Sequence, residues 1–222
     1  MTDPKISLNK LGEYLTASPA RRRRIVEDQI NPKPFIAARY NDAREYIVRY
    51  ISGEATEQDL TNKSQELRSK VYESDFTTQD KNLSADAIDD FLEIADLTST
   101  DKYKLEKVNA TKQSLLNISG VSISVRPDIY IKNDNNETVG AIKLHFPKSN
   151  PLNTPAGEYV ATGLRVFLEE QGDSKLIDHK LCSVIDIPSG NMISAPKASK
   201  KRMQDIAAGC EEIDARWKLK KI

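Results

Sequence analysis

The chain has 222 residues, of which 38% are hydrophobic and 30% are charged, so it is long and apolar enough for one large soluble domain or two small ones. Its 33 basic and 33 acidic residues give a formal net charge of zero, which excludes a global attraction to nucleic acid or to an anionic membrane. No apolar run approaches the roughly 20 residues that cross a bilayer, and the first residues lack a signal-peptide core, so we expect a cytoplasmic protein without a membrane partner.

Residues 1 to about 112 are predicted to be helical almost throughout. Ser18 and Pro19 are a typical helix start, because serine caps the free N–H groups and proline suits the first turn. Apolar residues recur at spacings of three and four over Phe35 to Ile51, which predicts an amphipathic helix. Further helices are predicted from Thr56 to about Tyr72 and from Ser84 onward.

Four consecutive arginines fall in the first turns of the helix after Pro19, namely Arg21, Arg22, Arg23 and Arg24. Successive side chains on a helix are about 100° apart, so the four cannot share one face. One interpretation is a solvated surface that pairs with nearby carboxylates. The other is phosphate contact, for which the planar, permanently charged guanidinium is suited. The sequence leaves both open.

The clearest strand pattern consists of two consecutive runs of alternating apolar residues, Val121 to Ile131 and Val139 to Phe146, with turn-forming polar residues between them. The runs predict two adjacent antiparallel strands, which we expect to pack on a helix over Ser199 to Trp217. Asp128 lies near the end of the first run and Lys143 in the middle of the second. An acid and an amine could therefore face one site.

At these residues the chain resembles the PD-(D/E)-x-K nuclease superfamily, the group of restriction endonucleases and RecB-like nucleases. In that family an Asp on one strand and an (Asp/Glu)-x-Lys sequence on the next meet where the two strands diverge. Pro127, Asp128 and Lys143 match this motif, whereas Ala141 stands where the family has its second carboxylate. Glu158, in the first turns of the helix after the second strand, is the nominated replacement; the alternative is that it only complements the dipole of that helix.

The resemblance covers about residues 85 to 217 and implies a metal-dependent nuclease that hydrolyses phosphodiester bonds, with DNA favoured as substrate, in phage defence or a mobile element. Asp128 and Glu158 would bind Mg²⁺ or Mn²⁺. Lys143 would orient the attacking water or stabilise the charge of the transition state. Candidates for a further acid from upstream are Glu93 and Glu106.

Ala141 also favours a different class of function. Because a fold does not fix a function, the chain could be a catalytically inactive nuclease-like module that binds nucleic acid, a partner protein in a larger assembly, or a second copy of itself. It could also be a purely structural subunit whose N-terminal helices dock on a partner. Without the resemblance, Asp128 is an ordinary strand-end acid and Lys143 an exposed strand lysine. Further candidates for phosphate contact, at or just before the start of the final helix, are Lys197, Lys200, Lys201 and Arg202.

The last third of the chain is predicted to add a helix that Thr154 opens and a hairpin of strands over Leu181 to Ile187 and Asn191 to Ala195. His145 has no nearby metal-ligand partner in the sequence. Asp186 is interpreted either as a third acid near the site or, as the safer choice, as an edge-facing acid. The whole pattern predicts an α+β fold with a mixed sheet of about four strands sandwiched by helices. The expected division is a helical N-terminal region over residues 1–112 and an α/β/α nuclease-like domain over residues 113–222.

Overall fold

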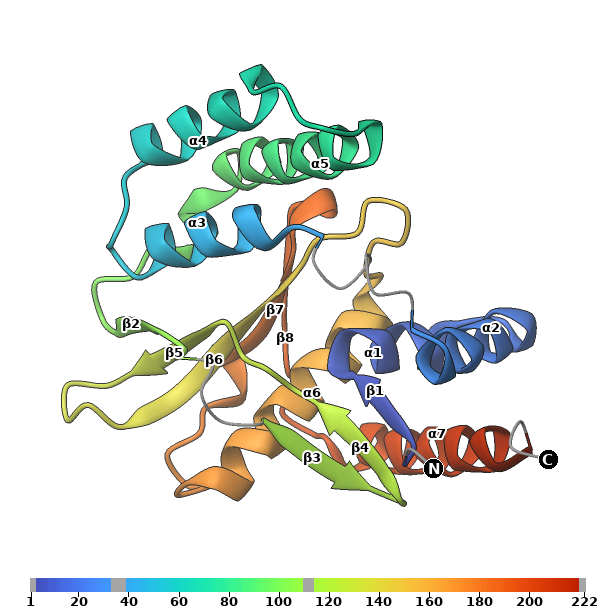
Figure 1. Ribbon diagram of the computed structural model, residues 1–222. Helices are drawn as coiled ribbons and strands as arrows, with labels where there is room; N and C mark the ends of the chain where they lie inside the picture. The colour runs from blue at the N-terminus through green and yellow to red at the C-terminus, as the bar shows by residue number, and fades with distance from the viewer. Residues whose placement is uncertain (1–2, 33–38, 110–113, 220–222) are drawn as a thin grey trace.

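A five-stranded mixed sheet runs through the middle of the computed structural model, which describes residues 3–32, 39–109 and 114–219 (Figure 1). β6 and β7 are parallel, and the other neighbouring pairs are antiparallel. The strands lie in the order β2 (Lys104–Lys107), β5 (Ile129–Lys132), β6 (Thr138–His145), β7 (Cys182–Asp186) and β8 (Asn191–Ser194). The α+β class and the mixed sheet are therefore confirmed, with β2 as one strand more than predicted.

A second, three-stranded sheet contains the first half of the run that was predicted to be one strand. β4 (Val121–Ser124) lies between β1 (Lys5–Ser7), which is parallel to it, and β3 (Leu115–Ile118), which is antiparallel. The prediction of a continuous strand to Ile131 is wrong. Arg126 adopts a left-handed backbone with φ 45°, and Pro127 has no N–H to donate to a ladder, so the chain turns here from one sheet into the other.

Seven α-helices surround the two sheets within the described residues. α3 and α5 cover one face of the large sheet with α4 packed on them, and α6 covers the other face with α1 packed on it (Figure 1). The helices are α1 (Leu8–Thr16), α2 (Pro19–Ile30), α3 (Asn41–Ile51), α4 (Glu57–Ser69), α5 (Asp75–Leu92), α6 (Thr154–Gln171) and α7 (Lys200–Leu219). None of them is long and apolar enough to cross a bilayer.

The final helix packs elsewhere than predicted. α7 contacts β3 and β4 of the small sheet, together with α1, α2 and α6. The hairpin of β5 and β6 is instead buried by α3 to α5 on one face, because its residues Ile129, Ile131 and Ile142 belong to their apolar core. The expected packing on α7 is thus realised for β4, the half of the run that left the large sheet.

The helix boundaries agree with the sequence where a cap is explicit. Ser18 caps α2 with Pro19 in its first turn, and Thr56 caps α4. α5 begins earlier than predicted, because Ser74 is its N-cap, whereas Ser84 is buried within the helix. The predicted start of α3 at Phe35 lies outside the described residues. The helix begins at Asn41, since the preceding residue has a left-handed backbone.

The N-terminal region is helical as predicted but also contributes strands to both sheets. β1 pairs with β4, and β2 pairs with β5. The predicted division between residues 112 and 113 lies outside the described residues.

Along β6, successive side chains point to opposite faces of the sheet. Ile142 and Leu144 enter the core formed with α3 to α5, and Ala141 enters the core formed with α1 and α6. Lys143 and His145 have the parity of Ala141. The sheet therefore directs two polar side chains toward the same interior, which positions the site described next.

Candidate functional site

Five charged or histidine side chains are buried in the described part of the chain, and all five lie on β6 or beside its C-terminal half. They are Glu13, Asp128, Lys143, His145 and Asp186, each at most 6% exposed. Burying an ionisable group costs free energy unless it is paired, so such groups are rare in the interior. Their concentration at one end of one strand identifies the candidate functional site.

Asp128 lies immediately before β5 and is held by two other elements, β6 and α3. Its N–H donates to the Ile142 carbonyl at 2.9 Å, and its Oδ2 accepts the N–H of Leu144 at 2.8 Å. Its Oδ1 accepts from the guanidinium of Arg44 on α3, which forms an ion pair with it. The carboxylate is thus fully engaged by a strand N–H and by an arginine from the helical layer.

Lys143 is buried beside Asp128 rather than exposed on the strand. Its Nζ donates to the Arg126 carbonyl at 2.8 Å. Burial lowers the pKa of Lys143 to about 8, because the charged form loses its hydration. The charge of Asp128 opposes this shift, and those of Arg44 and Arg126 add to it. The structure therefore brings together the acid and the amine that the sequence had placed on neighbouring runs.

The charges around Asp128 are predominantly positive. Arg44, Arg126 and Lys143 all act on this site, against the one carboxylate of Asp128. The Arg44 side chain is 39% exposed and therefore reaches the surface. Its guanidinium lies over the Phe146 ring, 5.3 Å from the ring centroid, in a cation–π contact. Arg126 is also exposed. The exposed side chains beside the buried Asp128 and Lys143 are consequently cationic.

His145 and Asp186 form a second buried pair that the sequence did not reveal. They are register partners on the parallel strands β6 and β7, with His145 Nε2 3.8 Å from Asp186 Oδ1. His145 Nε2 lies 3.0 Å from the Asn150 carbonyl, to which it must donate because a carbonyl only accepts. His145 Nδ1 and Asp186 Oδ2 have no protein partner. The interpretation of Asp186 as an edge-facing acid is therefore wrong.

Burial lowers the pKa of His145, although the nearby Asp186 favours its charged form. Lys10 and Glu13 of α1 also act on this imidazole, and Glu13 is itself paired with Lys10 and with Arg21. The polar interior thus extends from Asp128 to α1. No sequence pattern indicated that α1 contributes to this interior, because Glu13 lies more than a hundred residues before β5 and β6.

Glu158, the expected second carboxylate, has a different partner from Asp128. It lies on α6 and forms an ion pair with Arg202 of α7. Ala141, at the family's carboxylate position, is fully buried. No group of three or more His, Cys, Asp or Glu side chains that could hold a metal ion occurs in residues 3–32, 39–109 and 114–219.

The two upstream acids also lie apart from Asp128 in their contacts. Glu93 follows α5 as its C-cap residue. Glu106 of β2 is opposite Tyr130 and lies 3.6 Å from Lys104 and 3.9 Å from Lys132. Neither acid has a recorded ion pair or hydrogen bond with the Asp128 site in the described structure.

The predicted basic residues divide into paired and exposed members. Arg21 pairs with Glu13, Arg22 with Glu212 of α7, and Arg202 with Glu158. These three have structural contacts inside the molecule. Within the described structure, no ion pair or side-chain hydrogen bond engages the exposed side chains of Arg23, Arg24, Lys197, Lys200 and Lys201. The exposed five remain candidates for phosphate contact.

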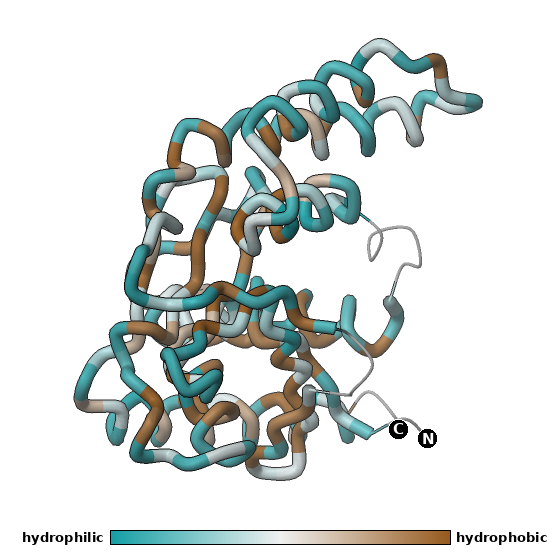
Figure 2. Tube along the Cα trace, turned by 90° about the vertical axis from the view of Figure 1, so that its left-hand side faces the viewer, coloured by the Kyte–Doolittle hydropathy of each residue, from teal (hydrophilic) through white to brown (hydrophobic). Residues whose placement is uncertain are grey.

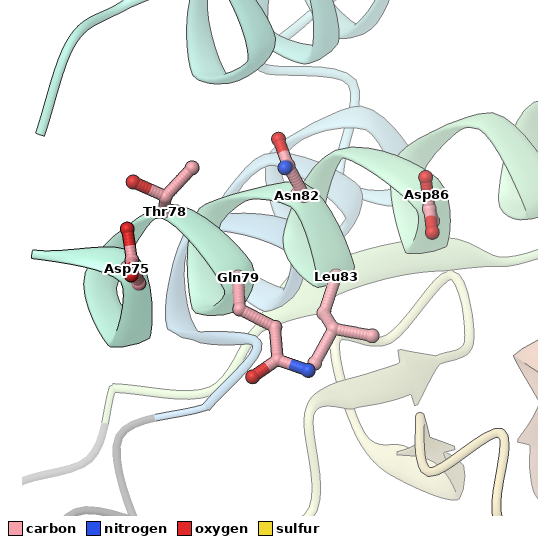
Figure 3. A pocket seen from close by; sticks show the side chains of 6 residues that line it. All are labelled: Asp75, Thr78, Gln79, Asn82, Leu83 and Asp86. Atoms are coloured by element: carbon pink, nitrogen blue, oxygen red, sulfur yellow. The ribbon is translucent and has the colours of Figure 1, made fainter.

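A separate hollow of about 410 Å³ lies along one side of α5 (Figure 3). Its lining is polar except for one leucine and consists of Asp75, Thr78, Gln79, Asn82, Leu83 and Asp86. None of the predicted site residues lines it. It is therefore distinct from the buried ionisable cluster beside β6.

Asp128 and Lys143 are adjacent, Arg44 binds the acid, and Arg126 binds the amine through its carbonyl. Comparisons of the chain with protein-family models, with curated proteins and with solved structures find no match.

Proposed function

We propose that this chain is a nuclease-like module that binds the phosphates of nucleic acid, with DNA favoured, and does not cut it. The observation that carries this proposal is the ion pair of the partly exposed Arg44 with Asp128, at a site where the other nearby charges, Lys143 and Arg126, are positive. The three-layer arrangement and the neighbouring positions of Asp128 and Lys143 support the resemblance to nucleases. The charge of the site supports binding of an anion.

A phosphate group suits the charges of this site better than a divalent cation does. Guanidinium groups bind phosphate oxygens through a planar pair of N–H donors, and such charge-assisted hydrogen bonds are strong. Because the Arg44 side chain is partly exposed, its guanidinium can rotate from Asp128 toward a phosphate. A cation would instead meet a site with two arginines, one lysine and one carboxylate. Electrostatics therefore favours the anion.

The second candidate is the metal-dependent nuclease, and the lowered pKa of Lys143 beside Asp128 favours it. Bound Mg²⁺ or Mn²⁺ would polarise the scissile phosphate and supply an activated water. The donor set does not fit this ion, because Glu158 is paired with Arg202 and Ala141 provides no side-chain ligand. We therefore assign Asp128 and Lys143 no catalytic step.

The decisive experiment measures binding and cleavage together. We expect the protein to bind labelled duplex DNA in EDTA, and to leave it intact in millimolar Mg²⁺ or Mn²⁺. Arg44→Ala and Arg126→Ala should each weaken binding roughly tenfold, the loss of about 1.4 kcal/mol of charge-assisted contact. Fluorescence anisotropy gives the affinities, and denaturing gels of the same samples give the cleavage.

Arg68→Ala is the matched control, because Arg68 on α4 has the same exposed fraction of 39% and is also ion-paired. It should bind as the wild type does. Metal-dependent cutting that Asp128→Asn abolishes would replace our proposal by the nuclease. Unchanged binding in both arginine variants would remove this site from the interface.

The exposed basic residues give a separate prediction about salt. If they contact phosphates, the affinity of two double variants should depend less steeply on salt. The negative slope of log K against log salt should become less negative by about one per lost contact in Arg23→Gln/Arg24→Gln and in Lys200→Gln/Lys201→Gln. Lys175→Gln, an exposed lysine without a predicted role, should leave the slope unchanged. Affinities measured over a salt series test this, and equal slopes in all variants would show that these charges only solvate the surface.

A further inference from the structure

The ion pair of Arg44 with Asp128 joins the helical layer to the strands at the candidate site. Figure 2 shows the layer of α3, α4 and α5 on one side of the strands, with mostly hydrophilic residues at its outer end. Arg44 comes from α3 in this layer, whereas Asp128 lies immediately before β5 of the large sheet. The pair therefore occupies the guanidinium that is proposed above to bind a phosphate.

The carboxylate of this ion pair is fixed by the backbone, whereas the guanidinium reaches solvent. Asp128 is only 6% exposed, its N–H donates to the Ile142 carbonyl, and its Oδ2 accepts the N–H of Leu144. The Arg44 side chain is 39% exposed, and it gains rotamer freedom when the pair opens. Opening the pair thus means that Arg44 turns away while Asp128 stays in place.

Both partners keep other contacts when the ion pair opens. The Arg44 guanidinium lies over the Phe146 ring, 5.3 Å from its centroid, so an aromatic surface remains beside it. Asp128 keeps the N–H of Leu144 and the attraction of the buried amine of Lys143. A buried carboxylate with a hydrogen bond and a nearby cation avoids the full cost of an unpaired charge.

Among the described residues, Asp128 is the carboxylate that is ion-paired with Arg44. On α3 itself, Asp42 is paired with Lys81 of α5, and Glu45 is exposed. Asp128 is thus the internal anion with which a phosphate has to compete for this guanidinium.

We propose that Asp128 is an internal competitor of phosphate, which holds Arg44 in the free protein and thereby weakens the binding of nucleic acid. The inference rests on the function proposed above and adds a regulatory contact to the same site. Carboxylate and phosphate oxygens accept from the same planar set of guanidinium N–H donors, so the two anions compete. The apparent affinity for DNA is then reduced by the fraction of molecules in which Arg44 is released.

Fluorescence anisotropy with labelled duplex DNA in EDTA tests the inference. Asp128→Asn should bind the DNA about three- to tenfold more tightly than the wild type, because an amide no longer holds Arg44 as an ion pair does. In the Arg44→Ala background the same substitution should give no gain. This double-mutant cycle isolates the contact, since an effect of the lost charge on Lys143 or on the whole surface would persist without Arg44.

Asp134→Asn is the matched control, because it makes the same substitution at an exposed position of the β5–β6 turn. Its affinity should differ from that of the wild type by less than about twofold. Far-ultraviolet circular dichroism and thermal unfolding verify that each variant is folded. A second measurement leaves Asp128 in place: the side-chain ¹⁵N NMR signals of Arg44, assigned with Arg44→Lys, should shift when DNA is added, whereas those of the ion-paired Arg68 should not.

Three results would overturn the inference: binding by Asp128→Asn that is no tighter than that of the wild type, a gain that persists in Arg44→Ala, or Arg44 signals that DNA leaves unchanged. The proposed function would still stand in each case if Arg44→Ala weakens binding. A wild type that binds no DNA in EDTA would instead contradict the proposed function itself, so the two failures are distinguishable.

Discussion

Ala141→Glu is expected to lower the free energy of unfolding by about 3 to 5 kcal/mol and not to create a metal site, although it restores the carboxylate of the nuclease motif. Ala141 is fully buried, and its register partners are Tyr130 on β5 and Cys182 on β7. A carboxylate at this position would enter the apolar core shared with α6, where desolvation disfavours its charge. The larger side chain would also overpack this core.

Urea denaturation with and without Mn²⁺ measures this effect. Ala141→Gln is the matched control, since it has nearly the same size without the charge and should lose only about 1 to 3 kcal/mol from overpacking. If the glutamate variant were as stable as the wild type and Mn²⁺ stabilised it further, the site would accept a second acid. The nuclease interpretation would then regain its donor set.

The part of the site that the sequence predicts comes from local alternation. Asp128 and Lys143 were placed together because β5 and β6 form a hairpin, and the period-two pattern of such strands fixes which residues face each other. The same pattern conceals the break between β4 and β5. Val125 and Ile129 have the same parity, so the alternation continues across a turn from one sheet into another. Pro127, which cannot donate to a ladder, was the available signal.

The rest of the site depends on contacts between distant segments. Arg44 reaches Asp128 from a helix 84 residues away. His145 and Asp186 become neighbours only through the parallel register of β6 and β7, which the crossover of α6 sets. Alternating apolar residues show that two strands exist, but they do not show which strands pair in parallel or in what register. No local pattern of the chain contains that information.

Lys143→Met is expected to raise the free energy of unfolding at pH 7 by about 2 kcal/mol. The fall of the Lys143 pKa from 10.5 to about 8 means that the folded state disfavours the charged amine. Such a shift costs about 3 kcal/mol wherever both states bind the proton, that is, below pH 8. The variant also loses the hydrogen bond from Nζ to the Arg126 carbonyl, which lowers its stability by about 1 kcal/mol and leaves the net gain of about 2 kcal/mol.

A lysine that costs stability at a buried position is explained by a role other than folding, because functional sites commonly trade stability for function. A methionine of similar length would fill the same space without a charge. In the site proposed here, Lys143 contributes to the positive potential that receives a phosphate. Lys143→Met should therefore weaken DNA binding while it stabilises the protein. A structural lysine would give the opposite combination, lower stability with unchanged binding.

The pH dependence of the stability difference between Lys143→Met and the wild type tests whether the lowered pKa of Lys143 causes the gain in stability. Between pH 8 and 10.5 the unfolded chain keeps a proton on Lys143 that the folded chain has lost, so the lysine's penalty disappears as the pH rises. Cys182 and Cys210 act in the opposite direction, because burial raises the pKa of both thiols to about 12 and only the unfolded chain loses their protons above about pH 9.

Both cysteines are present in wild type and variant, so the difference between the two proteins isolates Lys143. Denaturation in urea from pH 7 to 10 should show the advantage of Lys143→Met decreasing steadily above pH 8. Lys104→Met, which replaces a lysine with a side chain 65% exposed, should show no such trend. A stability difference that stays constant from pH 7 to 10 would mean that Lys143 keeps its charge on folding, and the buried amine would then be paired more strongly than its contact with Arg126 indicates.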